Sequence, residues 1–276
     1  MRVQHNMAAA NTNRQLGITS GNLAKSTEKL SSGYKINRAG DNAAGLTISE
    51  KMRGQIKGLE QASTNAQDGI SLIQTAEGAL NETHSILQRM RELTVQASND
   101  TNVTVDREAI KEELTALTNE VSRIASQTEF NKKKLLDGSI STVTQNLQVG
   151  ANQGQNITFK IDKMTASALG VQAANVADKV SKYADATKAI SVLDTAITKV
   201  STQRSKLGAI QNRLEHTIAN ADNAAENLQS AESRVRDVDM AKEMVKYSKS
   251  NILQQAAQSM LAQANQSTQG VLSLLQ

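Results

Sequence analysis

The stretch LTISEKMRGQIKGLEQASTNAQDGISLIQTAEGALNETHSILQRMRELTVQA, residues 46–97, decides the fold, because its apolar side chains recur every seven residues and no proline interrupts them. The repeat consists of Met52, Leu59, Ala66, Ile73, Leu80 and Leu87, and Leu72, Ala79, Ile86 and Leu93 widen the same stripe. A heptad repeat of this length predicts one long helix that must bury its stripe against a partner helix. At 1.5 Å of rise per residue the helix would extend for roughly 80 Å, so the sequence predicts a rod.

The amino-acid composition points to a thin helical core. Aromatic residues make up 2% of the 276 residues, and proline is absent. The core must therefore be built from alanine, leucine, isoleucine, valine and methionine, which suits a bundle or a coiled coil. Glycines gather at two places where the chain is expected to leave the helix, a joint and a hairpin. They are Gly33, Gly40 and Gly45 at the joint and Gly138, Gly150 and Gly154 at the hairpin.

A second heptad repeat follows from about residue 184 and supplies the partner helix. Its members are Leu193, Val200, Leu207, Leu214, Ala221, Leu228 and Val235, with Ile197 and Ile218 beside them. A shorter stripe, formed by Ile110, Leu114, Leu117, Val121 and Ile124, predicts a third helix that ends near residue 127. The predicted fold class is mainly α, an elongated antiparallel helical bundle or coiled coil with one small β-hairpin.

The hairpin is predicted where the apolar period changes from helical to two. Leu147 and Val149 alternate with polar residues, a glycine-rich turn GANQG follows, and Ile157 and Phe159 alternate again. Residues 162–183 are alanine-rich and polar, with weak periodicity. We expect them to form only a short connection that reverses the chain, because they are too few for another domain.

The two ends of the chain carry apolar stripes that are too sparse to fold alone. The stripe of residues 1–32 consists of Leu16, Leu23 and Leu30, and residues 240–276 mirror it with Ile252, Met260 and Leu261. Helices draw most of their stability from packing of an apolar face, so both ends should be loosely ordered until a neighbour covers them. Because the two ends meet in an antiparallel bundle, these residues are the candidate self-assembly residues.

The chain therefore divides into six segments. The predicted order is a terminal helix at 1–33, a glycine-containing joint at 34–45, the first bundle helices with the hairpin at 46–161, the connection at 162–183, the second long bundle helix at 184–239 and another terminal helix at 240–276. Three starts are open for the first long helix: Asp41, Asn42, or a capping box from Thr47 to Glu50.

Charge and hydropathy argue against several classes of function. The net charge of +4 comes from 31 basic and 27 acidic residues that are interspersed, so no basic face of the kind that binds nucleic acid is visible. No stretch approaches 18 continuous apolar residues, and the N-terminus lacks the apolar segment of a secretory signal. We therefore expect no membrane insertion, and either a cytoplasmic chain or one exported without a cleaved signal peptide.

Motifs for catalysis and for cofactors are absent from the sequence. The three histidines, His5, His84 and His216, have no partner at metal-ligand spacing, and cysteine is absent. No nucleophile elbow, phosphate-binding loop or dinucleotide-binding glycine pattern occurs. We expect no cofactor, no metal and no enzymatic activity.

Four glycines, Gly54, Gly58, Gly69 and Gly78, lie inside the first long helix. Each costs about 1 kcal/mol relative to alanine in a helix interior. Either they are tolerated on the surface, or they let another helix approach closely, within the bundle or from an adjacent subunit. The sequence favours neither explanation.

Six motifs, spread over most of the length of the chain, resemble the bacterial flagellins. They are HNMAAANTNRQL at 5–16, LSSGYKINRAGDNAAGLTISEKM at 30–52, LQRMRELTVQASNDTN at 87–102, SQTEFNKKKLLDG at 126–138, LQVGANQGQNITFKI at 147–161 and ENLQSAESRVRDVDMAKEM at 226–244. Two positions depart from the family pattern, because Ala10 replaces a leucine and Thr268 replaces a proline. Both departures lie in the terminal segments, so they bear on the packing of the ends.

The resemblance implies a secreted structural subunit of the bacterial flagellar filament, used for motility, in a short form without large outer domains. The terminal helices would form an inner tube and the long helices an outer tube. The implied partners are identical subunits, the flagellar export apparatus, a flagellin export chaperone, and the filament cap and hook-filament junction proteins. Two alternatives remain: a hook-filament junction protein, against which the match at 87–102 and at the hairpin argues, and an enzyme built on a helical bundle.

The charged cluster Arg89, Arg91, Glu92 and Glu113 is by default an ordinary solvated face. The resemblance gives part of it a second role, because vertebrate Toll-like receptor 5 recognises similar flagellins at matching positions. The implied receptor-binding residues are Gln88, Arg89, Glu92, Leu93, Gln96 and Glu113. Leu93 would be the apolar anchor and Arg89 the polar one.

Overall fold

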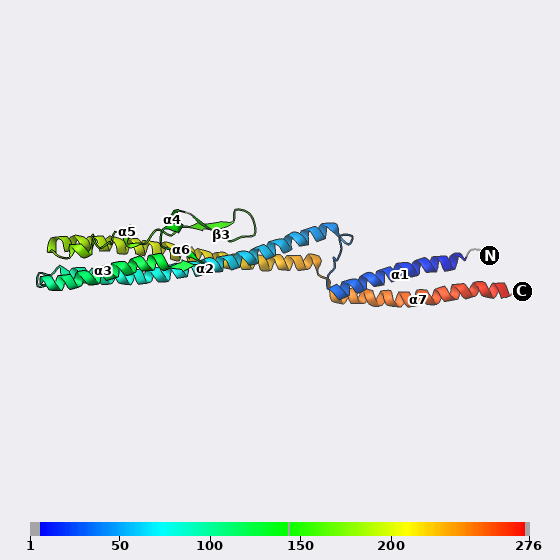
Figure 1. Cartoon of the computed structure of the whole chain (residues 1–276). Coiled ribbons are helices and arrows are strands. Elements are labelled where there is room, and N and C mark those ends of the chain that lie inside the picture. The colour runs from blue at the N-terminus through cyan, green and yellow to red at the C-terminus, as the bar shows by residue number, and fades with distance from the viewer. Residues whose placement is uncertain (1–5, 143, 274–276) are drawn as a thin grey trace. The chain divides into compact units, whose positions relative to one another are not determined.

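The computed structural model describes residues 6–142 and 144–273 (Figure 1). Its elements are α1 (Met7–Ser32), α2 (Ala43–Ala97), α3 (Thr104–Gln127), β1 (Glu129–Phe130), β2 (Lys133–Lys134), α4 (Ser139–Thr142), β3 (Gln145–Gln148), β4 (Asn156–Phe159), α5 (Ala166–Leu169), the 3₁₀ helix η1 (Ala177–Lys179), α6 (Tyr183–Arg236) and α7 (Met240–Ser273). The chain forms two compact units. The first unit combines Met1–Gly54 with Glu226–Gln276, and the second unit is Gln55–Ala225.

The second unit contains the predicted antiparallel bundle. The guanidinium of Arg91 on α2 lies 2.7 Å from the carboxylate of Asp194 on α6, and Glu77 lies 3.6 Å from Arg204. The earlier residue of α2 pairs with the later residue of α6, so the two helices run in opposite directions. The heptad leucines and isoleucines line one continuous core in which the following are fully buried: Ile73, Leu80, Leu87, Leu114, Leu193, Leu207 and Leu214. The prediction of a mainly helical antiparallel fold is confirmed.

The first long helix begins at Ala43, three residues before the predicted start. The side-chain oxygen of Asn42 accepts a hydrogen bond from the Gly45 backbone N–H at 2.9 Å, which is the contact of a helix N-cap. The proposed capping box from Thr47 to Glu50 is wrong, because the Thr47 hydroxyl donates to the carbonyl of Ala43 inside the helix. Asn42 is therefore the start signal.

Two antiparallel strand pairs are present among the described residues, where the sequence indicated one. The predicted hairpin is β3 with β4, in which Leu147 faces Ile157. The additional pair, β1 with β2, is closed by a two-residue turn at Asn131 and Lys132, which both have positive φ, of 49° and 63°. The sequence pattern missed this pair because strands of two residues are too short to show an alternating period.

The segment at 162–183 is part of the core and is not a plain connection. Its apolar side chains are buried, with Met164, Leu169, Val171, Val176 and Val180 each at most 4% exposed. The hydroxyl of Thr118 on α3 donates to the Val171 carbonyl at 3.3 Å, and α5 and η1 both contact α3. The segment therefore forms a further layer on the bundle, made of short turns that leave no periodic signal.

Two of the four helix glycines allow a close approach, and the approaching element is the β3–β4 hairpin. A Cβ atom at Gly58 would lie 2.8 Å from the Cβ of Ala151, and one at Gly69 would overlap the Leu147 side chain. Gly54 and Gly78 have open space around the same position. Gly54 and Gly78 are therefore tolerated on the surface. Gly58 and Gly69 do permit a close approach, but the approaching element is a hairpin and not a helix.

We expect opposite effects from alanine at Gly58 and at Gly78. Gly58→Ala should lower the free energy of unfolding by about 1 to 2 kcal/mol, because the new methyl group meets the backbone and side chain of Ala151. Gly78→Ala should raise it by about 0.5 to 1 kcal/mol, since alanine favours the helix and nothing is displaced. Urea unfolding of both variants checks this, and equal shifts of the same sign would contradict it.

Candidate self-assembly surface

Helix α1 is defined by a signal at each end. At the start, the Asn6 side chain accepts a hydrogen bond from the Ala9 backbone N–H at 3.0 Å. At the end, Gly33 takes the left-handed conformation, with φ of 76°, and its N–H donates to the Lys29 carbonyl at 2.9 Å. Both signals lie in the motifs at 5–16 and 30–52, so those motifs fix the length of the terminal helix.

Helices α1 and α7 lie side by side and run in opposite directions within the first unit (Figure 1). The Asn6 amide donates to the Ala264 carbonyl at 3.0 Å near one end of the pair. Near the other end, the Ser26 hydroxyl donates to a carboxylate oxygen of Glu243 at 2.8 Å. These two contacts fix the register of the pair along its length.

The residues that face each other, which we name the α1–α7 seam, alternate with coiled-coil spacing. On α1 they are Leu16, Thr19, Leu23, Ser26 and Leu30, and on α7 they are Glu243, Tyr247, Gln254, Ala257 and Leu261. Their side chains are buried or half-buried. The α7 half of the seam is mostly small or polar, so the pair gains little apolar burial from its own contact.

Large apolar side chains of the pair are exposed outside the seam. We name this set of residues the outer apolar face; on α7 its members lie on more than one side of the helix. The outer apolar face consists of Met7 and Ile18 on α1, and of Met240, Met244, Val245, Ile252, Leu253 and Met260 on α7. Each is between 47% and 73% exposed. Soluble proteins rarely leave so many large apolar side chains on one helix pair, and such a face marks an interaction surface.

The six predicted self-assembly residues divide between these two surfaces. Leu16, Leu23, Leu30 and Leu261 lie half-buried in the seam, whereas Ile252 and Met260 lie on the outer apolar face. The sequence interpretation missed Val245 and Leu253, which precede Ile252 and Met260 by seven residues each. That seven-residue spacing was the signal that could have identified them.

The two residues that depart from the family pattern, Ala10 and Thr268, lie on different terminal helices. Ala10 is exposed on α1, outside the seam. Thr268 lies within the backbone of α7, and its side chain lies outside the described part of the chain.

Glu243 is the buried acid of the seam. It is 5% exposed, and its carboxylate binds the Ser26 hydroxyl at 2.8 Å and the Lys246 ammonium at 3.0 Å. Burial raises the pKa of this carboxyl, but the contacts with Ser26 and Lys246 favour the charged form and outweigh burial. The pKa of Glu243 therefore lies below its ordinary value of 4.5.

The pairing of α1 with α7 should consequently weaken in acid. A carboxyl whose pKa is lowered on folding stabilises the folded state above its unfolded pKa, near 4.5, and this stabilisation is lost as the pH falls through the folded pKa. Glu243→Gln should remove this part of the acid transition, which circular dichroism during an acid titration would detect. Glu60→Gln, at an exposed position of α2, is the control and should titrate like the unchanged chain.

The joint of the first unit is held by backbone and ring contacts. Tyr34 forms an isolated antiparallel bridge with Asp237, and the Val238 N–H donates to the Gly33 carbonyl at 3.0 Å. The guanidinium carbon of Arg236 lies 4.5 Å from the centre of the Tyr34 ring. The residues that precede α2 and those that precede α7 are thus tied directly to each other.

In the second unit, the predicted receptor residues form one exposed patch, with one exception. Gln88, Arg89, Glu92 and Gln96 are exposed on α2, and the Arg89 guanidinium lies 3.0 Å from Glu113 on α3. The Glu113 contact raises the pKa of Arg89, and a weaker contact with Glu92 at 3.3 Å acts in the same direction.

The exception is Leu93, which is 2% exposed and belongs to the core. The expectation that it is an exposed apolar anchor is therefore wrong for this structure, because Leu93 continues the buried stripe of α2. Val95 is 49% exposed and lies seven residues after Gln88, so it is the apolar side chain that this face of α2 presents.

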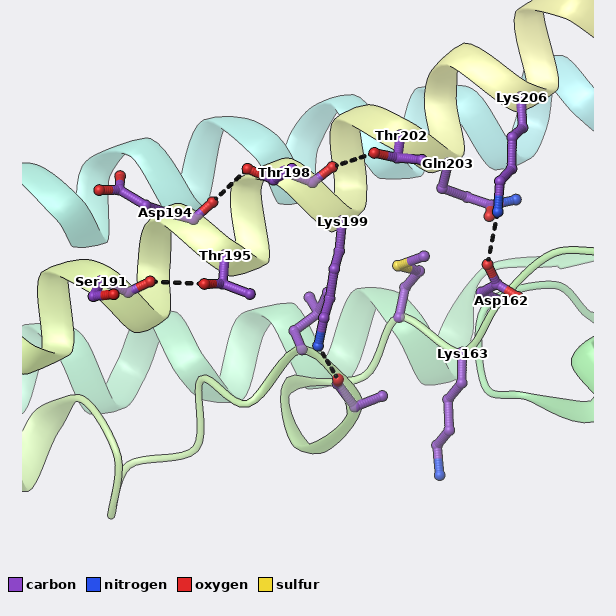
Figure 2. A pocket seen from close by; sticks show the side chains of 13 residues that line it. Asp162, Lys163, Ser191, Asp194, Thr195, Thr198, Lys199, Thr202, Gln203 and Lys206 are labelled. Carbon is purple, nitrogen blue, oxygen red and sulfur yellow. Dashed lines mark hydrogen bonds and ion pairs between the residues drawn. The ribbon is translucent and has the colours of Figure 1, made fainter.

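A groove of about 680 Å³ runs beside α6 in the second unit (Figure 2). Its polar groups bind one another: Lys206 pairs with Asp162 at 3.4 Å, Lys199 donates to the Ala168 carbonyl at 3.3 Å, and the Gln203 amide donates to the Lys160 carbonyl at 3.3 Å. These contacts attach the segment after β4 to α6. We assign the groove a structural role.

Residues 6–142 and 144–273 contain neither a metal-ion site nor a membrane-spanning helix. No group of three histidine, aspartate or glutamate side chains there is arranged to hold a metal ion. His5 lies outside the described residues. No helix in this part of the chain is both long and apolar enough to cross a membrane.

Similarity to known proteins agrees with the helical architecture. A model of the bacterial flagellin N-terminal helical region matches residues 3–141, and one of the bacterial flagellin C-terminal helical region matches residues 190–275. The chain is 58% identical over 275 residues to a flagellin of Halalkalibacterium halodurans and 55% identical over 303 residues to a flagellin of Bacillus subtilis. Each alignment covers 100% of both chains.

A solved structure of a putative flagellar hook-associated protein from Vibrio parahaemolyticus has the same fold. Its TM-score is 0.61 at 12% identity, and the match covers 71% of this chain and 100% of that one. At this identity the likeness concerns the fold alone, and it does not favour the hook-filament junction alternative.

A long-helix bundle joined to a terminal helix pair with an exposed apolar face defines a helical structural subunit. The chain belongs to the bacterial flagellin family and is a subunit of the flagellar filament. This family is a structural one, and it assembles by self-polymerisation.

Proposed function

We propose that the subunit polymerises by docking the outer apolar face of α1 and α7 onto identical subunits. The observation that carries this proposal is the arrangement of α7, whose small and polar side chains face α1 while Val245 and Ile252 are exposed on the side away from the seam. A second copy supplies what one chain lacks, an apolar cover for this face. A subunit whose two docking surfaces differ forms an open helical polymer when the rotation between neighbouring copies does not close a ring.

A shallow groove offers a place for the docking side chains. It measures about 360 Å³ and lies between α1 and α7, where Thr12 and Thr19 face Leu253, Ala257 and Met260. The mixture of small and apolar walls suits an aliphatic side chain of the neighbouring copy. Leucine and isoleucine side chains gain roughly 1.5 to 3 kcal/mol when they are fully buried.

The test is seeded polymerisation of the purified chain, observed by negative-stain electron microscopy, beside a chain that lacks residues 1–32. We expect filaments from the full chain and none from the truncated one, because the truncation removes all of α1. If the truncated chain polymerised equally well, the terminal pair would not be the docking surface. If the intact chain stayed monomeric, the proposal would be withdrawn.

We also propose that the filament is thin and smooth. In place of the outer domains of longer flagellins, residues 162–183 form turns that pack onto the bundle through Leu169, Val171 and Val180. Electron micrographs should therefore show a filament diameter below that of flagellins with long insertions. An equal diameter would contradict this proposal.

Export and assembly require further partners, which we propose from the family. These are the flagellar export apparatus, a flagellin export chaperone, the filament cap and hook-filament junction proteins, with delivery to the extracellular filament without a cleaved signal peptide. Exposed apolar side chains on α7 support the chaperone proposal, since such a face needs cover before assembly. Co-purification of the full chain with a chaperone, lost on removal of residues 240–276, is the test.

The patch around Arg89 supports a second role in recognition by vertebrate Toll-like receptor 5. Gln88, Glu92, Gln96 and Glu113 surround an exposed arginine whose geometry is fixed by two carboxylates. Arginine held in this way is a typical centre of a protein interface. Leu93 would support the patch from inside the core.

Binding of the purified chain to the receptor ectodomain on a sensor surface tests this second role. Arg89→Ala should weaken binding by about tenfold or more. Arg123→Ala is the control, because Arg123 makes a comparable exposed pair with Glu120 on a different part of α3. If Arg89→Ala bound the receptor ectodomain as tightly as the unchanged chain, the proposed second role would be contradicted.

A further inference from the structure

The methionines among the described residues differ in their exposure. The exposed ones are Met7, Met240, Met244 and Met260, which are 73%, 51%, 55% and 59% exposed and lie on the outer apolar face. In the second unit, Met90 and Met164 are 0% and 4% exposed. Met52 is half-buried in α2.

We propose that these four exposed methionines, Met7, Met240, Met244 and Met260, are an oxidation-sensitive modification site that controls whether a free subunit can polymerise. The proposal rests on the proposed docking surface, because it concerns the same face. Thioether sulfur atoms at more than half exposure are open to peroxide in the free subunit. The same atoms would be covered once a second copy docks.

The chemistry is a two-electron oxidation by hydrogen peroxide. A sulfur lone pair attacks one peroxide oxygen, the O–O bond breaks, and an S=O bond forms. The sulfur is oxidised, the peroxide is reduced, and the second oxygen leaves as water after proton transfer. The product, methionine sulfoxide, is polar where the thioether was apolar, and thiol-dependent sulfoxide reductases can reverse it.

Oxidation acts on docking because of where these side chains lie. Met260 borders the groove of about 360 Å³ between α1 and α7, next to Leu253. Met240 and Met244 are one helical turn apart, at the start of α7. A sulfoxide at each site places a polar oxygen in a surface that the neighbouring copy must dehydrate, so docking weakens while the fold of the monomer is kept.

The experiment treats the purified full-length monomer with dilute hydrogen peroxide, removes the peroxide, and adds filament seeds. Peptide mass spectrometry locates each added oxygen, and sedimentation measures the critical concentration. We expect oxygen at Met7, Met240, Met244 and Met260 before it appears at Met90 and Met164. We expect the critical concentration to rise by at least about tenfold. Treatment with methionine sulfoxide reductase should restore polymerisation.

The matched variant replaces Met7, Met240, Met244 and Met260 with leucine. Leucine has a similar volume and no oxidisable sulfur, so the critical concentration of the variant should be the same before and after peroxide treatment. Pre-formed filaments should take up oxygen at these four positions more slowly than monomers do. Equal polymerisation of oxidised and untreated wild type would overturn the inference, as would equal inhibition of the leucine variant.

The failure of the inference differs from the failure of the proposed function. If untreated wild type forms no filaments, the proposed function fails, and the inference that oxidation inhibits polymerisation fails as well. If untreated wild type polymerises but filaments oxidise at these four positions as fast as monomers, these methionines are not covered by docking. In that case the inference is overturned, while polymerisation of the subunit, as proposed above, still stands.

Discussion

Ile252→Asp should abolish filament growth at concentrations where the unchanged chain polymerises. Ile252 is 66% exposed on α7, so the substitution leaves the core of the monomer intact. In the proposed docking the same position becomes covered, and the variant would bury a carboxylate where an aliphatic side chain belongs. Lost apolar burial alone amounts to roughly 1.5 to 3 kcal/mol, and the unpaired charge adds several kcal/mol more.

Since each 1.4 kcal/mol changes an equilibrium constant tenfold, the critical concentration should rise by at least about 100-fold. Sedimentation of filaments over a range of monomer concentrations measures it. Ile252→Leu keeps an apolar side chain of the same size and should polymerise normally. Circular dichroism of the monomer should be the same for all three chains. Normal growth of the aspartate variant would show that this part of α7 is not an interface.

The second large effect is expected in the segment at 162–183. Leu169→Ala should lower the free energy of unfolding by about 2 to 5 kcal/mol, because Leu169 is 2% exposed and its removal leaves a cavity. A plain surface connection would tolerate the same substitution. Chemical denaturation of the chain, followed by circular dichroism, gives the free energy.

Ser167→Ala supplies the control for this experiment. Ser167 belongs to the same short helix, α5, but its side chain is exposed. We expect a change within about 0.5 kcal/mol. Equal effects of both substitutions would mean that the segment does not pack as described.

The long-range order of the fold could be read from the sequence because heptads report burial directly. Ile73, Leu80, Leu193 and Leu207 were placed in a helical core by spacing alone, and all four are fully buried. Alternation predicted the β3–β4 hairpin by the same logic. In these cases one physical pattern, repeated many times, left no competing interpretation.

Features without a repeat could not be read in this way. Met164, Leu169 and Val180 are buried at irregular spacing by short turns, so no period marks them. Leu93 was assigned both to a core stripe and to a surface site, and only the packing of the second unit decides for the core. The turn at Asn131 and Lys132 joins strands too short to predict.

The candidate site was predicted only in outline. Leu16, Leu23 and Leu30 have the spacing of a seam, but spacing does not tell which face of α7 they meet. The seam side of α7 proved to be largely polar, with Glu243 buried in it. Helix α7 therefore lacks a single apolar stripe from which the sequence could assign an inner and an outer face.

The polar seam also has a thermodynamic consequence. A helix pair that buries little apolar area within one chain draws much of its melting temperature from its neighbours, through mass action. The second unit, whose leucines are buried within the chain, should instead melt at a temperature that does not depend on protein concentration. Calorimetry at several concentrations would separate the two transitions. The terminal helices of this protein are thus stabilised mainly by contacts between subunits, whereas the long-helix bundle is stabilised by contacts within one chain.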